Sequence, residues 1–155
     1  IRLTGGDLFR SLGSPVVHDG TVRVVPVDAL VVTHDDETML AVAHVVVRRA
    51  FWRGEVLVAM NATHVGALDL GPRAHPNDGL MDVTEGSLGP RERLAARRRA
   101  RSGAHVPHPQ LRTSRVRQLN RTFVERAPIR CDGRQVGVTR SLQVEVLPDA
   151  FQVAI

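Results

Sequence analysis

The stretch Leu142-Gln143-Val144-Glu145-Val146-Leu147 indicates the fold class, because its apolar and polar side chains alternate. Successive side chains of a β-strand point to opposite faces, so the apolar residues face one side and the polar residues face the other. This alternation is typical of a strand that packs on a core on one side and meets solvent on the other. The stretch therefore predicts a half-buried β-strand.

Valine-rich runs of similar length occupy most of the remaining chain. They predict strands at residues 22–33, 39–47, 55–60, 80–83, 115–124, 129–131, 134–138, 142–147 and 151–155. Pro26 lies inside the first run and indicates an edge strand or a bulge there, since proline cannot donate to a strand ladder. About eight strands with few helices predict a mainly β fold, an antiparallel sandwich or layered sheet.

Two segments predict helices. Residues 7–13 fit a short helix that Asp7 caps and Gly13 ends. Residues 87–101 fit a longer, arginine-rich helix, because a proline is tolerated in its first turn and Glu92 lies where the helix dipole favours an acid. The chain is therefore expected to carry one short N-terminal helix and one arginine-rich helix.

Length and composition limit the class of protein. A chain of 155 residues fits a single domain, and its hydrophobic fraction of 43% is ordinary for a globular protein. No apolar run reaches the ~18 residues that a membrane span needs, and no leader opens the chain. With one cysteine no internal disulfide can form, so we expect a cytoplasmic protein, with a peripheral location at the membrane as an alternative.

Arginine alone supplies the permanently positive side chains of this protein. The formal net charge is +5, and all 21 basic residues are arginine. Arginine binds phosphate in a bidentate manner, so the composition suits an anionic partner, although a GC-rich genome would produce the same bias. The arginines at 91–101 form either a solvated helix face or a surface for anionic phospholipid headgroups. Nucleic acid is disfavoured, because few aromatic side chains are present to stack on bases.

Two Asp-Gly turns carry the candidate chemistry. Asn77-Asp78-Gly79 predicts a turn, and Asp78 with Asp82 supplies hard oxygen ligands for Mg²⁺ or Ca²⁺. Asp132-Gly133-Arg134 predicts a hairpin turn. A carboxylate at its tip can accept a proton from an attacking hydroxyl, as a general base does in phosphoryl transfer. For both turns a purely structural role is the alternative.

A series of motifs follows along the chain. They are Thr4-Gly5-Gly6-Asp7, Asn61, residues 72–82, Asp132-Gly133 and residues 146–151. In this order they resemble the diacylglycerol kinase family, which belongs with sphingosine kinases and NAD kinases in one superfamily. The resemblance spans nearly the whole chain and is strongest from Asn61 onward. It implies the β-rich C-terminal domain of a lipid kinase, with residues 1–13 as the remnant of a nucleotide-motif helix.

The resemblance also implies roles for individual residues. Thr4-Gly5-Gly6-Asp7 matches the family's second nucleotide motif, which implies contact with ATP. Asp78, with Asp82 beside it, falls on a position that helps to bind a structural divalent cation in bacterial members, which implies Mg²⁺. Asp132 falls on the aspartate of the family's Asp-Gly-Glu motif, the proposed catalytic base.

The chain departs from the family pattern at several positions. The family's Gly-Gly-Asp-Gly-Thr phosphate loop does not occur in these 155 residues, and Leu3 and Gly6 replace a glycine and an asparagine. Arg134 replaces the glutamate that follows Asp-Gly, so a cation stands where the family has an acid. Positioning of the phosphates is most of what catalyses phosphoryl transfer, so these changes bear directly on activity.

Taken together, the sequence predicts a diacylglycerol kinase-related protein. If active, it would transfer the γ-phosphoryl group of ATP to a lipid hydroxyl. One alternative is a non-catalytic relative in which Arg134 and other arginines hold an anionic lipid or a phosphorylated ligand. Another is a subunit that completes its site with a second chain, such as a copy of itself in a homo-oligomer.

Overall fold

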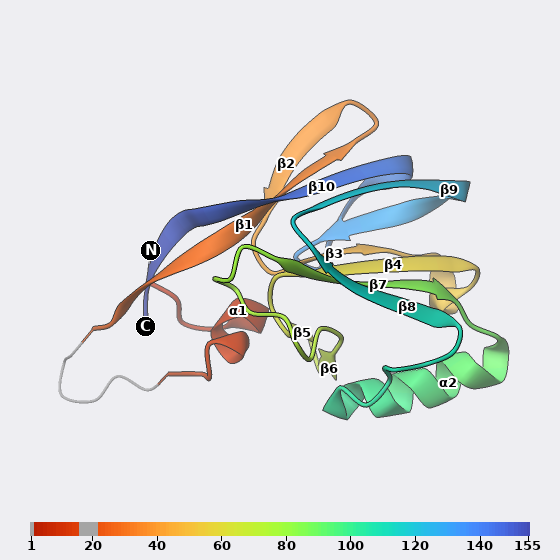
Figure 1. The fold of residues 1–155 in the computed structure, drawn as a ribbon, viewed down its shortest axis with the longest axis horizontal. Helices are drawn as coiled ribbons and strands as arrows, with labels where there is room; N and C mark the ends of the chain where they lie inside the picture. The colour runs from red at the N-terminus through yellow and green to blue at the C-terminus, as the bar shows by residue number, and fades with distance from the viewer. Residues whose placement is uncertain (1, 16–21) are drawn as a thin grey trace.

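An eight-stranded antiparallel sheet dominates the computed structural model, which describes residues 2–15 and 22–155 (Figure 1). Its strands are β1 (Val24–His34), β2 (Glu37–Ala41), β3 (His44–Val47), β4 (Glu55–Met60), β7 (Met81–Ser87), β8 (Leu111–Val116), β9 (Gln118–Cys131) and β10 (Arg134–Ala154). They are arranged in the order β2-β1-β10-β9-β3-β4-β7-β8. A separate small hairpin joins β5 (His64–Val65) and β6 (Leu68–Asp69). The predicted mainly β, antiparallel architecture is confirmed.

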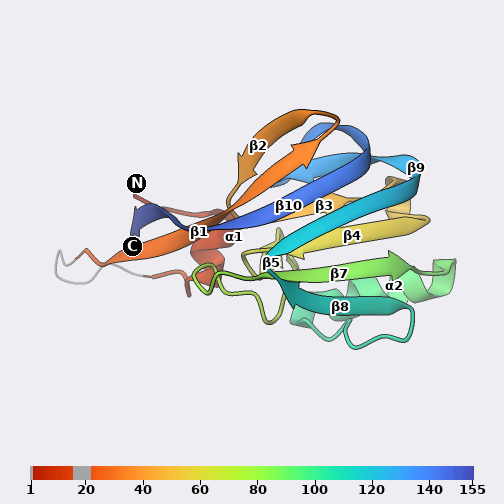
Figure 2. The same cartoon turned by 45° about the horizontal axis from the view of Figure 1, so that its top comes forward.

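The sheet folds over into two layers, and β9 takes part in both. Residues 118–122 of β9 pair with β10, whereas residues 129–131 also pair with β3. β8 pairs with β7, and Arg117 joins it directly to β9. The chain therefore crosses from one layer to the other between β8 and β9 (Figure 2). β2, β1 and β10 form most of one layer, and β3, β4, β7 and β8 form the other (Figure 1).

The main core fills the space between the two layers. Branched aliphatic residues dominate it, as expected for a chain in which aromatics make up 3%. Its fully buried members include Leu30, Val32, Val45, Leu57, Met81, Ile129 and Val144. At roughly 25 cal/mol per Å² of apolar surface, burial of each such side chain stabilises the fold by about 1.5–3 kcal/mol.

Two smaller apolar clusters lie outside the layers. Val46, Val58 and Met60 on the outer face of β3 and β4 pack against Leu70, Ala74 and Ala100. A third cluster joins the N-terminal helix to β1, β10, the β2–β3 turn and the segment after β4: Leu8, Val27, Ala43, Ala62 and Val153. These clusters fasten the helices and loops that carry the polar residues considered below.

Both predicted helices form. α1 (Gly6–Ser11) is short, and Gly13 with φ 85° follows its end. Asp7 is not its cap, which corrects the expectation: Gly5 precedes the helix, and the Asp7 side chain points elsewhere. α2 (Pro90–Arg99) continues into a 3-10 turn at Ala100–Ser102, and Gly103 ends it with φ 68°. A second 3-10 turn, Ala50–Trp52, joins β3 to β4.

Some strand boundaries differ from the prediction for identifiable reasons. Residues 39–47 form two strands, β2 and β3, because the backbone N–H groups at the break bond to a distant side chain, Asp132. The three predicted strands after residue 134 form one bulged strand, β10, since β1 and β9 pair with it from both sides. A register shift between Val27 and Ala29 follows Pro26, as predicted.

Within the described residues, no helix is long and apolar enough to cross a membrane.

Candidate functional site

A cavity of about 430 Å³ lies where α1 meets the β2–β3 and β9–β10 turns, and we call it the Asp132 cavity. Residues from four parts of the chain line it. Gly5, Gly6 and Asp7 come from the N-terminal motif, and His44 and Asp132 come from the two turns. The cavity therefore brings together most of the predicted nucleotide motif and the predicted base. Thr4 is exposed and does not line it.

The carboxylate of Asp132 is held by backbone N–H groups of the β2–β3 turn. Oδ2 accepts the N–H of Val42 at 2.8 Å, and Oδ1 accepts those of Ala43 at 2.8 Å and His44 at 3.0 Å. A carboxylate offers about four acceptor positions, so one position on Oδ2 has no partner among residues 2–15 and 22–155. The predicted hairpin turn is confirmed: Asp132 and Gly133 have φ of 50° and 79°, as a two-residue hairpin turn requires.

His44 lies between the two acidic residues of the cavity. Its side chain is 1% exposed, and its Nδ1 lies 3.8 Å from Asp7 Oδ2. Neither ring nitrogen has a hydrogen-bond partner within the described residues. Burial lowers the pKa of His44 below its usual 6.5, although the nearby carboxylates of Asp132 and Asp7 oppose this. A neutral imidazole, with one donor and one acceptor nitrogen, is therefore available at the cavity wall.

α1 is fastened to the β5 region by its own side chains. Asp7 accepts the N–H of Gly66 at 3.0 Å, and Ser11 Oγ accepts the N–H of Thr63 at 2.8 Å. Leu8 is buried beneath the helix. These contacts fix the position of Asp7 relative to His44, so the acidic residue of the N-terminal motif is held at the cavity rather than left on a free end.

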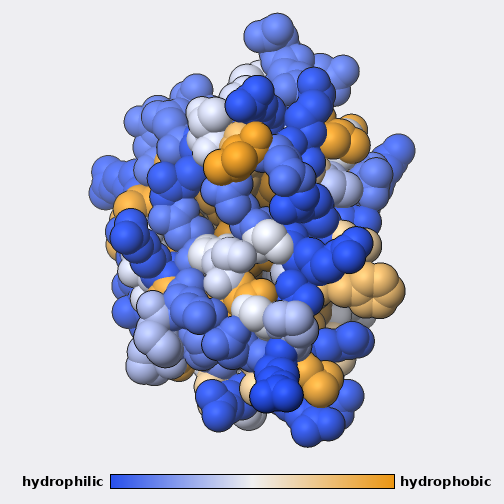
Figure 3. All heavy atoms as spheres, turned by 90° about the vertical axis from the view of Figure 1, so that its right-hand side faces the viewer, coloured by the Kyte–Doolittle hydropathy of each residue, from blue (hydrophilic) through white to orange (hydrophobic). Residues whose placement is uncertain are grey.

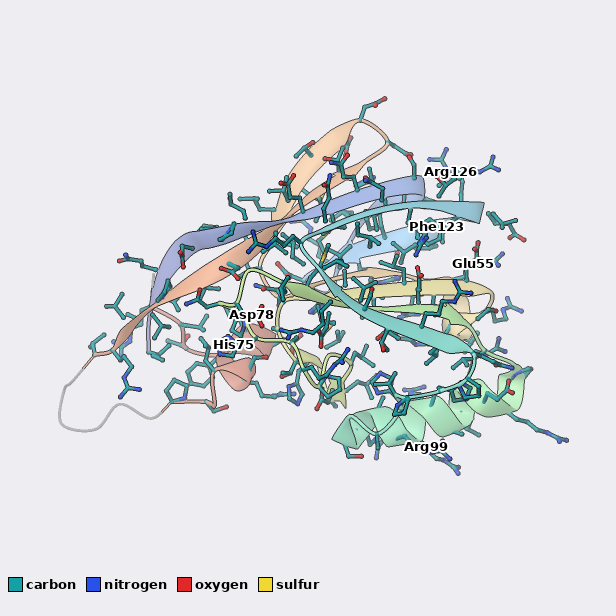
Figure 4. All side chains as sticks on the ribbon, viewed as in Figure 1. Glu55, His75, Asp78, Arg99, Phe123 and Arg126 are labelled. Carbon is teal, nitrogen blue, oxygen red and sulfur yellow. The ribbon has the colours of Figure 1, made fainter. Side chains whose placement is uncertain are left out.

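Asp78 and Asp82, the predicted metal ligands, share one arginine. Arg115 of β8 forms an ion pair with Asp78, and its Nε lies 2.9 Å from Asp82 Oδ1. Asp78 also accepts the N–H of Leu80 at 3.0 Å. Burial raises the pKa of Asp82 above its usual 3.8, while Arg73 and Arg115 oppose the rise. Asp78 lies on the loop before β7, on the side of the molecule near α1 (Figure 4).

In the structure the guanidinium of Arg115 lies against both carboxylates, where a divalent cation would otherwise bind. Within residues 2–15 and 22–155, no group of three or more His, Cys, Asp or Glu side chains is placed to hold a metal ion. The divalent-cation site thus stays a prediction, and a cation there would have to displace Arg115.

Asp28 is a buried polar residue that sequence reasoning gave no role. Its Oδ2 accepts the N–H of Gly79 at 2.8 Å, and its Oδ1 accepts that of Asp149 at 2.9 Å. It thereby ties the loop that carries Asp78 to β10. His44 and Arg115 were missed as well. No local pattern marks these residues, because each acts on a partner far away in the sequence.

A second cavity, of about 300 Å³, lies between β4 and α2, and we call it the Trp52 pocket. Its lining is mainly apolar and includes Trp52, Val58, Leu70, Leu88 and Leu94. His105 lines it too, and burial lowers the pKa of this histidine, although Asp69 opposes the effect.

Arg134, the predicted anion ligand, lines neither cavity; it is exposed beside Asp132.

A two-layer antiparallel sheet with its helices on the outside defines a β-sandwich-like domain. Residues 24–155 match the YegS C-terminal NAD kinase beta sandwich-like domain, and the chain belongs to that family. The resemblance to lipid kinases noted from the motifs is thereby confirmed at the level of the family. No curated protein sequence matches the chain.

Solved structures from Bacillus anthracis str. Sterne share the fold. A putative diacylglycerol kinase is 12% identical with a TM-score of 0.56, over 84% of this chain and 56% of that one. A second diacylglycerol kinase structure is 14% identical with a TM-score of 0.58, over 95% and 62%. A third, again a putative diacylglycerol kinase, is 15% identical with a TM-score of 0.51, over 82% and 39%. This chain therefore spans less than two thirds of each of these relatives.

Proposed function

We propose that this chain forms the acceptor side of a lipid kinase, which transfers the γ-phosphoryl group of ATP, with Mg²⁺, to a lipid hydroxyl in the cytoplasm. One observation carries the proposal: Asp7 and Asp132, from opposite ends of the sequence, line one cavity around His44. Membership of the YegS C-terminal family supports it, as does the shared fold with structures described as diacylglycerol kinases.

In this proposal Asp132 is the general base. The open acceptor position on Oδ2 takes the hydroxyl proton of the lipid while the lipid oxygen attacks the γ-phosphorus. The bond from that phosphorus to the bridging oxygen breaks, and ADP leaves with the electron pair. The backbone N–H groups of the β2–β3 turn keep the carboxylate in place, so no reorganisation is needed as the proton moves.

The nucleotide and the lipid are bound by different parts of the molecule in this proposal. Thr4-Gly5-Gly6-Asp7 contacts the nucleotide, and the apolar lining of the Trp52 pocket suits a hydrocarbon chain. Since the Gly-Gly-Asp-Gly-Thr loop does not occur in this sequence, the β- and γ-phosphates need donors from another segment or another chain. Mg²⁺ enters with the nucleotide.

A second candidate is a non-catalytic module that binds an anionic lipid or a phosphorylated ligand. It is favoured by Arg134, which is exposed next to Asp132 and makes no ion pair within the described residues. Asp132 would then serve only to hold the turn. In this reading the ligand binds at the same end of the sheet, and no bond is broken.

The test is calorimetric titration with Mg-ATP, combined with transfer of label from [γ-³²P]ATP to diacylglycerol in detergent micelles. Asp132→Asn keeps an oxygen acceptor for the β2–β3 turn, and Asp7→Asn keeps one for the N–H of Gly66. Asp36→Asn, in the exposed β1–β2 turn, is the control. Labelled lipid that is lost only in the Asp132 and Asp7 variants supports the kinase. Anion binding without transfer, weakened by Arg134→Glu, supports the second candidate. If millimolar ATP does not bind, the chain is no kinase by itself.

A further inference from the structure

The 3-10 turn between β3 and β4 presents an aromatic side chain to solvent. Phe51 is 81% exposed, and its backbone adopts a left-handed conformation with φ 53°. A bulky residue in this region is a conformational outlier that costs about 1 kcal/mol or more. Most of the side chain is uncovered by the described residues. A single exposed apolar side chain is common on protein surfaces, so Phe51 alone does not indicate a partner, and what lies beside it decides the matter.

A second exposed apolar residue stands on the same surface. Leu94 of α2 is 55% exposed, and both Leu94 and Phe51 line the Trp52 pocket. Because they border one cavity from two different elements, they lie on one side of the molecule. From the side that faces the viewer in Figure 3, separate hydrophobic residues stand among mostly hydrophilic ones. The apolar contribution is thus a few separate side chains rather than a continuous patch.

The helix that carries Leu94 is rich in positive charge that has no acidic partner within the described residues. Within residues 2–15 and 22–155, no ion pair is made by the arginines of α2 and its 3-10 extension: Arg91, Arg93, Arg97, Arg98, Arg99 and Arg101. The one acid of the helix, Glu92, is occupied with the N–H of Gly89 at 2.7 Å. Arg99 extends from the side of α2 away from the sheet (Figure 4).

Arg48 adds to this charge from the β3–β4 connection. Its guanidinium stacks over Trp52 at 4.9 Å from the ring centroid. Burial lowers the pKa of Arg48, and the positive charges of Arg130 and Arg97 lower it further. Cations that repel one another in this way gain most from a partner of opposite charge.

We propose that the surface formed by Phe51, Leu94 and the arginines of α2 docks on an anionic lipid bilayer. Phe51 and Leu94 enter the headgroup layer, and the arginines bind lipid phosphates. A bilayer fits better than nucleic acid, because apolar side chains accompany the charge and the exposed aromatic stands alone rather than in a stacking series. The Trp52 pocket then opens toward the membrane, and its use for a lipid substrate rests on the proposed function.

The test is sedimentation of the 155-residue chain with vesicles of phosphatidylcholine alone and with vesicles that also contain phosphatidylglycerol. We expect binding only to the anionic vesicles, and we expect salt to weaken it. Arg91 and Arg98 stand one turn before and one turn after Leu94 on the helix, and neither lines the pocket. Arg91→Glu with Arg98→Glu should lower affinity at least about 25-fold, at about fivefold for each arginine.

Phe51→Asn tests the apolar contact, since asparagine tolerates the left-handed backbone of this turn. It should weaken vesicle binding several-fold, whereas the controls Leu40→Asn on β2 and Arg117→Glu at the β8–β9 corner should not. Equal losses in the controls, equal binding to neutral vesicles, or binding to a DNA duplex in place of vesicles would overturn the proposal. Vesicle binding without lipid phosphorylation would leave it standing and remove the kinase.

Discussion

His44 and Asp132 are joined by a reciprocal pair of hydrogen bonds that involves the backbone of both residues. The Asp132 N–H donates to the His44 carbonyl oxygen at 3.0 Å, and the His44 N–H donates to the Asp132 carboxylate at 3.0 Å. Asp132 thus binds the N–H groups between the end of β2 and the start of β3, and it also lines the cavity. Its structural and chemical roles cannot be separated by removing the side chain, so the variants below are chosen to divide them.

Asp132→Ala should lower the free energy of unfolding by about 2 kcal/mol, because the N–H groups of the β2–β3 turn lose a charged acceptor. Asp132→Asn should lower it less, since one oxygen remains and asparagine tolerates φ 50°. Urea unfolding monitored by circular dichroism measures both. Arg134→Ala, on the same turn, is the control. Equal stability of the wild type and Asp132→Ala would show that the carboxylate does not hold the turn.

Acidification should destabilise the protein through His44. The pKa of His44 in the folded state lies below its unfolded value of 6.5. The stabilising contribution of the neutral ring is therefore fully present above pH 6.5, and it is lost as the pH falls through the folded-state pKa. The wild type should therefore lose more stability than His44→Leu between about pH 8 and about pH 5.5, as urea midpoints would show. The exposed His75, substituted in the same way, is the control. Parallel losses in wild type and His44→Leu would contradict the expectation.

Arg115 should make bound metal unnecessary at Asp78 and Asp82. We expect a chelator to leave the Tm of the wild type unchanged. Arg115→Gln should lower the free energy of unfolding by about 2 kcal/mol, because Asp82, 8% exposed, loses the nearer of its two cations and keeps only Arg73 at 3.9 Å. Added Mg²⁺ should then raise the Tm of this variant alone. Arg112→Gln on the same strand is the control. A wild-type Tm that falls on chelation would restore the divalent-cation site.

The same variant should change how stability depends on pH. Since the folded-state pKa of Asp82 is raised, its contribution is fully present below about its usual 3.8 and is lost as the pH rises through the folded value. Removing Arg115 takes away one of the charges that oppose this rise. The difference in stability between wild type and Arg115→Gln should thus be larger at about pH 7 than at about pH 4. A constant difference would mean that Arg115 acts on Asp82 by packing alone.

Gly86→Ala should destabilise the β7–β8 edge of the sheet. A Cβ at this position would lie 2.2 Å from the backbone oxygen of Gln110, and the φ of Gly86 is 155°. We expect a loss of about 2–4 kcal/mol, because backbone has to move to relieve the contact. Gly5→Ala is the matched control, since no atom lies within 4 Å of its added Cβ. Thermal unfolding compares the two, and similar melting temperatures would refute the steric argument.

The sequence was sufficient to predict the elements that local patterns define. Residues 55–60 and the arginine-rich helix follow from side-chain alternation, helix-capping residues and glycine, and they formed as expected. The end of β2 did not follow, because Asp132, 90 residues from Val42, binds the N–H groups there. The sharing of Arg115 by Asp78 and Asp82 likewise depends on the pairing of β7 with β8.

The sequence identified individual residues of the candidate site, but it did not show how they are arranged around one cavity. Motif resemblance selected Asp7 and Asp132 separately, and each lines the Asp132 cavity. His44, which lies between them, has only valine and alanine around it in the sequence and carries no signal of its own. Its position depends on the packing of α1 against the sheet, which is a long-range property of the fold.

The pairing of β1 with β10 also determines when the molecule can fold. Val24 is opposite Ala154 in the sheet, and Leu30 is opposite Val146. A growing chain on the ribosome therefore carries β1 with one long edge unpaired until β10 has been synthesised. Until then the free edge of β1 is available for pairing with other chains, and the β1–β10 contacts, distant along the sequence, are among the last that the fold can make.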